Sequence, residues 1–390
     1  MSSLLRRKSI FVVGLALAAM TFMGARCELG LNRQARLELQ AAGVDKYVGD
    51  FTPISSEDIG EGWTKHTFDP DGGNGPICIA GTPYSAYTKQ GNPSKLLIML
   101  QGGGACWQDF YFCNILEESQ APPPEPVGIW GESYDTGSEI IPNPIGDWSI
   151  VYMPYCDGSV FSGDNDVVDA NFPFGPVRFH RGLRNLTAGI DLAKATFANP
   201  HQVMVAGSSA GGVGAAGFAP FLARFAYGNF TRLSVFNDAG PVAVNLNETA
   251  AIQARAADWQ FGKFYPASCT ECDEEGQATA IIDWRLANDR TIHEAFYETD
   301  ADGTNRFFLN VPTQEAYREI IVTEHGKLHD AYPHRYKRFI VSGDTSHTAL
   351  QFDRFYEQEA NGVPLDVWTD DFLRRSHDWK DIVEDFVPVP

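Results

Sequence analysis

A serine between glycines is the residue of this 390-residue chain whose setting most directly suggests chemistry. A short apolar run at 203–206 is typical of a buried strand. Ser209 follows it in a G-x-S-x-G pentapeptide that begins at Gly207, and the small-residue run 212–224 can continue as a helix. Such a strand, sharp turn and helix lift a serine hydroxyl clear of a sheet and direct the next backbone N–H, that of Ala210, at an ester oxyanion. The alternative is a glycine-rich turn that only packs.

An activated serine needs a base, and chain order favours His347. It follows the apolar strand predicted at 337–343 and lies downstream of Ser209. The remaining histidines precede the serine or lie in stretches predicted as polar helices or loops, where a solvent-facing histidine is expected: His66, His180, His201, His293, His325, His329, His334 and His377.

The carboxylate that would orient His347 is not fixed by position. Asp238 follows a strand predicted at 232–237, whereas Asp300 and Asp302 come later in the chain, and the pattern leaves these three nearly level. Asp344 is so close to His347 in sequence that we expect it to shape the turn instead.

Three glycines follow a second apolar run, at 96–100. We expect a loop at Gly102, Gly103 and Gly104 whose backbone N–H groups face a ligand, and a flexible turn is the alternative. In a serine esterase, the N–H groups of such a loop complete the oxyanion hole with that of Ala210.

The elements that must position these residues alternate between strand and helix, and the glycine-rich and polar loops come at the ends of strands. This order predicts an α/β fold whose open, mostly parallel sheet has helices on both faces, with ligands along the carboxyl edge. Further elements are predicted as a helix at 32–42, a strand at 148–154, a helix at 178–197 and helices within 365–386.

The domain organisation predicted from these patterns is simple. Residues 28–77 look like a polar lead-in, the core is expected to begin near Cys78, and 78–390 form one domain. Weak periodicity at 241–287 predicts a small cap-like insertion in that domain.

The first 27 residues have a basic start, a short apolar stretch and then small residues, as in a secretory signal peptide. Cys27 is a candidate lipid-attachment site, but Arg26 stands where a small residue is wanted, so a soluble exported protein is favoured. The net charge of −20 and isoelectric point near 4.8 argue against nucleic acid and anionic membrane surfaces as partners.

Six cysteines remain after Cys27, an even number that fits three disulfides in an oxidising compartment. Cys269 and Cys272 could instead form half a zinc site or a redox pair. No second Cys/His pair at ligand spacing accompanies them in the sequence, so a small local disulfide is favoured.

Five stretches occur in one order that resembles the pectin acetylesterase/Notum family of secreted serine carboxylesterases. They are the glycine loop at 100–106, the polar loop at 155–164, the serine turn at 207–212, the Asp238-Ala-Gly240 turn and Ser346-His347. The resemblance runs from about Cys78 to Leu350. It implies an α/β-hydrolase-like fold and removal of an acyl group from an ester, without metal or organic cofactor.

Carried over to this sequence, the resemblance implies Ser209 as nucleophile, His347 as base, and Gly103, Gly104 and Ala210 as oxyanion donors. It also favours Asp302 as the acid, because the family places that residue in an Asp-x-x-Gln context and Asp302-Gly-Thr-Asn305 is similar.

The resemblance implies a Cys106–Cys113 disulfide and suggests Cys78–Cys156 as another. Gly104 stands where animal members have an aromatic residue, which leaves the acyl length open. The leading hypothesis is an exported esterase that deacetylates a polysaccharide such as pectin. Alternatives are an esterase or lipase for lipid or hydroxyalkanoate esters, and a non-catalytic binding protein on the same fold.

Overall fold

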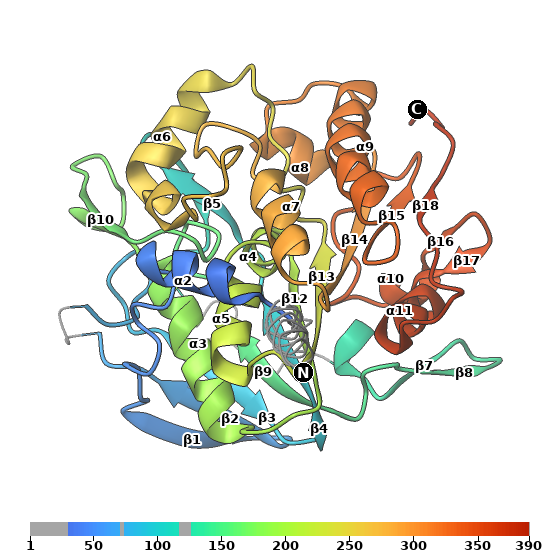
Figure 1. Cartoon of the computed structure of the whole chain (residues 1–390), viewed down its shortest axis with the longest axis horizontal. Helices are drawn as coiled ribbons and strands as arrows, with labels where there is room; N and C mark the ends of the chain where they lie inside the picture. Colours follow the sequence, from blue (N-terminus) through green and yellow to red (C-terminus); the bar gives the residue numbers. More distant parts are fainter. Residues whose placement is uncertain (1–29, 71–73, 117–125, 390) are drawn as a thin grey trace, which may run out of the picture.

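The computed structural model describes residues 30–70, 74–116 and 126–389 (Figure 1). The signal segment predicted at 1–27 lies outside them. The principal sheet has ten strands in the order β1-β2-β3-β9-β4-β12-β13-β14-β15-β18. Every neighbouring pair from β9 to β18 is parallel, whereas the pairs from β1 to β9 are antiparallel. The predicted mostly parallel α/β fold is therefore confirmed.

The strands of the principal sheet are β1 (Ser55–Gly60), β2 (Trp63–Thr67), β3 (Ser85–Lys89), β4 (Asn92–Leu100), β9 (Trp148–Met153), β12 (Gln202–Ser208), β13 (Arg232–Asp238), β14 (His293–Thr299), β15 (Tyr336–Val341) and β18 (Ile382–Val383). Shorter strands pair as β5 (Gly104–Trp107) with β6 (Phe110–Cys113), β7 (Ser133–Asp135) with β8 (Ile140–Pro142), β10 (Asn165–Val168) with β11 (Val177–His180), and β16 (Glu359–Ala360) with β17 (Val363–Pro364).

The helices are α2 (Arg33–Ala41), α3 (Gly182–Thr196), α4 (Ala210–Ala216), α5 (Ala219–Tyr227), α6 (Thr249–Trp259), α7 (Thr279–Asn288), α8 (Gly303–Phe308), α9 (Gln314–Ala331), α10 (Arg354–Glu357) and α11 (Leu365–Arg374). Two short 3-10 helices are η2 (Gly128–Trp130) and η3 (Phe261–Phe264). None of the helices within the described ranges is long and apolar enough to cross a membrane.

Helices cover both faces of the sheet, and the alternation of side chains along the strands explains why. In β4, Leu96, Ile98 and Leu100 pack on one face of the sheet, against a layer formed by α2, α3, α5, α7 and α9. Leu97 and Met99 pack on the other face, against η2, α10 and α11. Successive side chains of a strand point to opposite faces, so a central strand that is apolar throughout serves two cores at once.

Several element bounds differ from the predicted ones. The helix expected at 178–197 begins at Gly182, because the residues before it form β11. The run at 212–224 is divided between α4 and α5, which are separated at Gly217. The helices expected within 365–386 are reduced to α11, after which the chain returns to the sheet as β18.

The segment expected as a polar lead-in contributes to the core. Leu39 of α2 is fully buried. Trp63 of β2 and Phe68, just after that strand, are also almost completely buried. The two strands β1 and β2 extend the sheet as an antiparallel edge. The core therefore begins well before Cys78.

Three disulfides join Cys78 to Cys156, Cys106 to Cys113 and Cys269 to Cys272. All three pairings are as predicted. Cys269 and Cys272 lie between η3 and α7, in the chain that connects β13 to β14, where the cap-like insertion is expected.

Candidate active site

Ser209 occupies the sharp turn between β12 and α4, with φ 57° and ψ −122°. A non-glycine residue at positive φ carries backbone strain, and such strain clusters at functional sites. The flanking glycines are required by close approach: a Cβ on Gly207 would lie 2.1 Å from the carbonyl oxygen of Gly211, and one on Gly211 would lie 2.1 Å from that of Leu100. The predicted turn geometry around Ser209 is thus present.

The glycine loop lies directly against this turn. A Cβ on Gly102 would approach the Ser209 Cβ to 2.7 Å, and one on Gly103 would lie 2.2 Å from the Asn114 amide nitrogen. Gly104 has φ +77° and faces the Phe112 carbonyl oxygen, which a Cβ would meet at 2.0 Å. An aromatic residue at Gly104 is excluded by this backbone, so the departure from the family pattern has a local cause.

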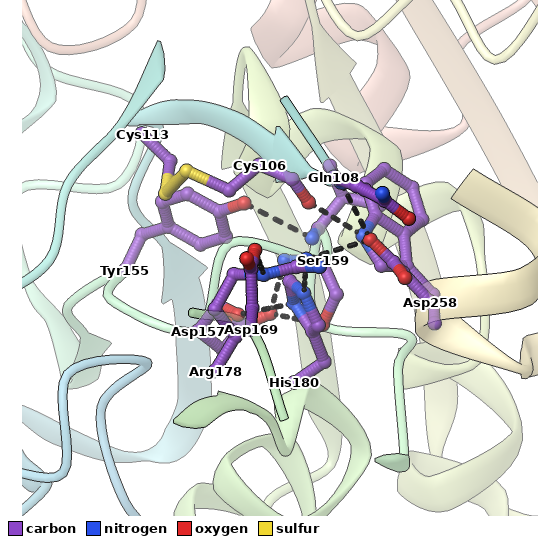
Figure 2. The surroundings of a disulfide bond; sticks show 12 residues. Cys106, Gln108, Cys113, Tyr155, Asp157, Ser159, Asp169, Arg178, His180 and Asp258 are labelled. Atoms are coloured by element: carbon purple, nitrogen blue, oxygen red, sulfur yellow. Dashed lines mark hydrogen bonds and ion pairs between the residues drawn. A yellow bond between two sulfur atoms is a disulfide. The ribbon is translucent and has the colours of Figure 1, made fainter. Parts of the chain in front are cut away.

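The hairpin β5–β6 that follows the glycine loop is fixed from two sides (Figure 2). The Cys106–Cys113 disulfide closes it, and the Gln108 N–H donates to Asp258 Oδ2 at 2.7 Å. Asp258, at the end of α6, also pairs with buried Arg178 at 2.6 Å. The network ties the glycine loop to the helix α6, which is distant in sequence.

His347 and Asp302 are hydrogen-bonded. His347 Nδ1 lies 2.6 Å from Asp302 Oδ2, and the Asp302 side chain is fully buried. The other ring nitrogen, Nε2, is buried and has no hydrogen-bond partner in the described part of the chain. No hydrogen bond joins His347 to Ser209 within those same residues. A base that receives its proton on Nε2 needs its Nδ1–H held by a carboxylate, as found here.

Asp302 is held rigidly by the start of α8. Its Oδ1 accepts hydrogen bonds from the backbone N–H groups of Thr304 and Asn305, at 2.8 and 2.9 Å, as a helix N-cap does. Its Oδ2 accepts from the Asn305 side-chain amide at 3.1 Å, in addition to the His347 contact. Asn305, which replaces the Gln of the family context, therefore contacts the carboxylate directly.

The competing carboxylates have structural partners instead. Asp238 accepts hydrogen bonds from Ser208 Oγ and from the N–H groups of Ala349 and Leu350, so it links the serine turn to the loop that carries His347. Burial raises the pKa of Asp238.

Asp300 pairs with Arg318 at 2.7 Å and accepts from Gln314 and Ser342. Asp344 accepts from the Ser346 N–H and shapes the turn, as expected. In the described ranges, none of the three is hydrogen-bonded to the His347 ring.

Glu298 is a site residue that the sequence analysis missed. It is fully buried in β14, and its Oε2 accepts from Tyr317 Oη at 2.8 Å and from the Asn305 amide at 3.0 Å. Burial raises the pKa of Glu298 well above its usual value, and the neighbouring Asp302 carboxylate raises it further. The raised pKa favours the protonated form of Glu298. The available signal in the sequence was the position of this acidic residue, four residues before Asp302, the candidate triad acid.

A mostly apolar cavity of about 150 Å³ opens beside Ser209. Ala210 and Gly104 line it together with Ser209, and its further walls are large side chains from β5, α6, η3 and α8: Trp107, Trp259, Phe261 and Phe308. The residues that would hold an oxyanion and those that would hold an apolar group thus adjoin one cavity.

A mostly parallel sheet that carries a strained serine turn at its carboxyl edge defines the α/β-hydrolase-like class of fold. Within that class, the model of the family described as Pectinacetylesterase matches residues 66–242. That range includes the glycine loop and Ser209 but not Asp302 or His347. The resemblance found in the sequence is thereby confirmed.

A curated relative agrees with this family match. Pectin acetylesterase 11 of Arabidopsis thaliana is 28% identical over 147 residues, an alignment that covers 36% of this chain and 36% of the relative. The chain therefore matches little more than a third of that relative's length.

Proposed function

We propose that this protein is an exported serine carboxylesterase that removes an acyl group, most simply acetyl, from a polysaccharide such as pectin. The family match and the name of the plant relative support the reaction class. The observation that carries the proposal is the His347–Asp302 hydrogen bond, with the opposite ring nitrogen unpartnered and the strained Ser209 beside an apolar cavity.

In the proposed mechanism, Ser209 Oγ attacks the ester carbonyl carbon while His347 Nε2 takes its proton. Asp302 holds Nδ1–H and stabilises the imidazolium that forms. The tetrahedral intermediate collapses to an acyl-enzyme, and His347 returns the proton to the leaving alcohol. Water then enters by the same route, releasing the acid and restoring Ser209.

The oxyanion would be held by backbone N–H groups of Gly103, Gly104 and Ala210. Ala210 is the first residue of α4, and N–H groups in the first turn of a helix have no partner within that helix. This scheme needs neither metal nor organic cofactor.

Export is part of the proposal. Three disulfides fit an oxidising compartment outside the cytosol. The segment at 1–27 would direct export and be removed, and Cys27 is the position for a lipid anchor if there is one. We also propose that residues 78–390 act as one esterase domain together with the strands before them, with 241–287 as its cap-like insertion.

The apolar lining of the cavity favours a second candidate. An acetyl group would contact little of the wall formed by Trp107, Trp259 and Phe308, whereas a longer acyl chain of a lipid or hydroxyalkanoate ester would bury against it. Chain length is therefore the property that separates the two substrates.

Labelling with a fluorophosphonate probe tests the proposal. The folded protein should be labelled, Ser209→Ala should not be, and hydrolysis of p-nitrophenyl acetate should fall by several orders of magnitude in that variant. Ser94→Ala, which removes an exposed hydroxyl near the start of β4, is the control and should still be labelled. Absence of labelling in the folded wild-type protein would favour a non-catalytic binding protein.

A series of p-nitrophenyl esters of increasing length, measured beside acetylated pectin, then decides between the two substrate classes. A kcat/KM that falls steadily from acetyl onward supports the polysaccharide deacetylase. A maximum at longer chains supports the lipid or hydroxyalkanoate ester.

A further inference from the structure

Arg255, on α6, places a guanidinium group in the wall of the cavity beside Ser209. The side chain is half-buried, and its Cζ lies 5.4 Å from the centre of the Trp107 ring, another wall residue. Trp107 in turn stacks on Phe110, with ring centres 4.0 Å apart. The cation is therefore held in one orientation by a packed aromatic pair.

The buried arginines in the described part of the chain pair with carboxylates. Arg178 contacts Asp169 and Asp258, Arg224 contacts Asp289, and Arg285 contacts Glu294: pairs with N–O distances between 2.6 and 2.8 Å. Within the described ranges, no such ion pair and no hydrogen bond involves the Arg255 guanidinium. Removing a charge even partly from water without a partner is costly, so the unpaired guanidinium of Arg255 calls for a functional explanation.

The second charged residue in the cavity wall does not neutralise it. Glu274 accepts a hydrogen bond from the Gly262 N–H at 3.1 Å, and no ion pair links it to Arg255 in the described structure. Burial lowers the pKa of Arg255 to about 10, without an opposing contribution from a nearby acid. The group still carries its charge at neutral pH and has an unmet preference for an anion.

The helix that carries Arg255 is anchored to the oxyanion loop. Trp259 donates from its indole N–H to the Cys106 carbonyl oxygen at 2.8 Å, and Asp258 accepts from Gln108 (Figure 2). Arg255 lies one turn earlier on the same helix. Its position relative to Ser209 is thus fixed by the network that also fixes the glycine loop.

We propose that Arg255 is a specificity-determining residue that binds a carboxylate of the ester substrate while Ser209 attacks the ester. A planar guanidinium forms two parallel hydrogen bonds with a carboxylate, and in a water-poor cavity each is stronger than at the surface. The apolar walls would hold the carbon skeleton between the two groups. This inference rests on the proposed esterase function and adds the charge of its substrate.

The carboxylate could belong to the acyl part or to the alcohol part of the ester, and two substrate pairs distinguish these sources. The first compares mono-p-nitrophenyl succinate with p-nitrophenyl butyrate. The second compares O-acetyl lactate with its neutral amide. For each pair, the ratio of kcat/KM for the anionic ester to that for the neutral ester is measured in the wild type, Arg255→Met and Arg255→Lys.

We expect one of the two ratios to fall about ten- to hundredfold in Arg255→Met and to be partly retained in Arg255→Lys. Arg374→Met is the control: it removes one positive charge from an exposed pair with Asp370 on α11 and should not change either ratio. If both ratios in Arg255→Met equal those of the wild type while the esters are hydrolysed, the carboxylate assignment is wrong and the esterase proposal stands.

Binding provides a test that does not need turnover. In the Ser209→Ala protein, butyrate should quench tryptophan fluorescence at concentrations where butyramide does not, and the added Arg255→Met substitution should abolish the difference. A wild-type protein that hydrolyses none of the esters overturns the esterase proposal. Equal binding of butyrate and butyramide overturns the role of Arg255.

Discussion

Asp302 and Glu298 lie side by side in the core and accept hydrogen bonds from the same amide, that of Asn305, at 3.1 and 3.0 Å. Two carboxyl groups this close cannot both ionise without large cost. Asp302 faces His347, and Glu298 faces the Tyr317 hydroxyl. The raised pKa of Glu298 favours placing the proton of this pair on Glu298.

The first prediction concerns the triad acid. Asp302→Asn should preserve the shape of the site but hold the wrong tautomer of His347, which lowers kcat by roughly 10⁴. Asp300→Asn and Asp238→Asn should cost far less in kcat, although both break buried hydrogen bonds. The measurement is kcat of the three variants on one activated ester, with circular dichroism as the check on folding. A large loss confined to Asp300→Asn or Asp238→Asn would move the acid to that residue.

The second prediction concerns the proton on Glu298. Glu298→Gln resembles the protonated acid in shape and charge, so the acidic limb of the pH profile of kcat should stay at the same pH. Glu298→Ala removes the partner of Tyr317 and Asn305 and should lower kcat at least tenfold, on the order of 1.4 kcal/mol. A shift of the acidic limb to lower pH in Glu298→Gln would mean that Glu298 is ionised beside Asp302.

The third prediction separates two disulfides by their effects. Replacing Cys78 and Cys156 by serine opens a loop with a sequence separation of 78, whereas Cys106 and Cys113 are separated by 7. In the chain-entropy account the free energy of unfolding falls by about 4–5 and about 2–3 kcal/mol, respectively. The Cys106/Cys113 variant should nevertheless lose more activity, because that bridge closes the hairpin beside the glycine loop. Urea unfolding and kcat/KM measured together provide the test, and equal activity losses would count against it.

The fourth prediction concerns acid stability and His325. This buried ring stacks on Phe296 and accepts from the Tyr336 hydroxyl while its Nε2–H donates to the Pro241 carbonyl. Burial lowers the pKa of His325 to about 3. The unfolded chain binds this proton near pH 6.5 and the folded chain does not, so stability is full above that pH and is lost as the pH falls toward 3.

The slope from one such group is about 1.4 kcal/mol per pH unit between those limits. His325→Gln should be less stable than the wild type at pH 7.5 but should lose less stability on going to pH 4.5. Chemical unfolding at the two pH values measures this. An unchanged difference between them would show that His325 is protonated in the folded state. The exposed His201 is the control position, and His201→Gln should leave the difference as it is in the wild type.

The sequence predicted the serine turn well because its requirements are local. A Cβ at position 207 or 211 would clash with neighbouring backbone, so only glycine fits there. That requirement can be read directly from the amino-acid sequence. Asp302 was predicted as the partner of His347 because the stretch from Asp302 to Asn305 is similar to the family's Asp-x-x-Gln, whereas its position along the chain alone did not distinguish it. That partner depends on a contact between the start of α8 and the loop after β15, which no short stretch of sequence contains.

Strand β14 was missed, and its charges explain why. Glu294 and Glu298 give it a polar pattern, yet both are buried. Arg285 pairs with Glu294, and Glu298 accepts hydrogen bonds from Tyr317 and Asn305. His293 starts this strand and His325 is buried against it, although both were expected in solvent-facing stretches. Whether a charged residue can be buried depends on partners that are distant in sequence, and a hydrophobic pattern contains no information about those partners.

The chain between β13 and β14 supplies much of the cavity wall but none of the proposed catalytic groups. Within it, Asp258 and Trp259 form hydrogen bonds with the hairpin β5–β6, and Arg255, Trp259 and Phe261 line the cavity. In the proposed mechanism, selectivity and turnover are thus encoded by separate stretches of one polypeptide. A directed-evolution library confined to Arg255 and Phe261 would explore new substrates while retaining the residues proposed to perform the reaction.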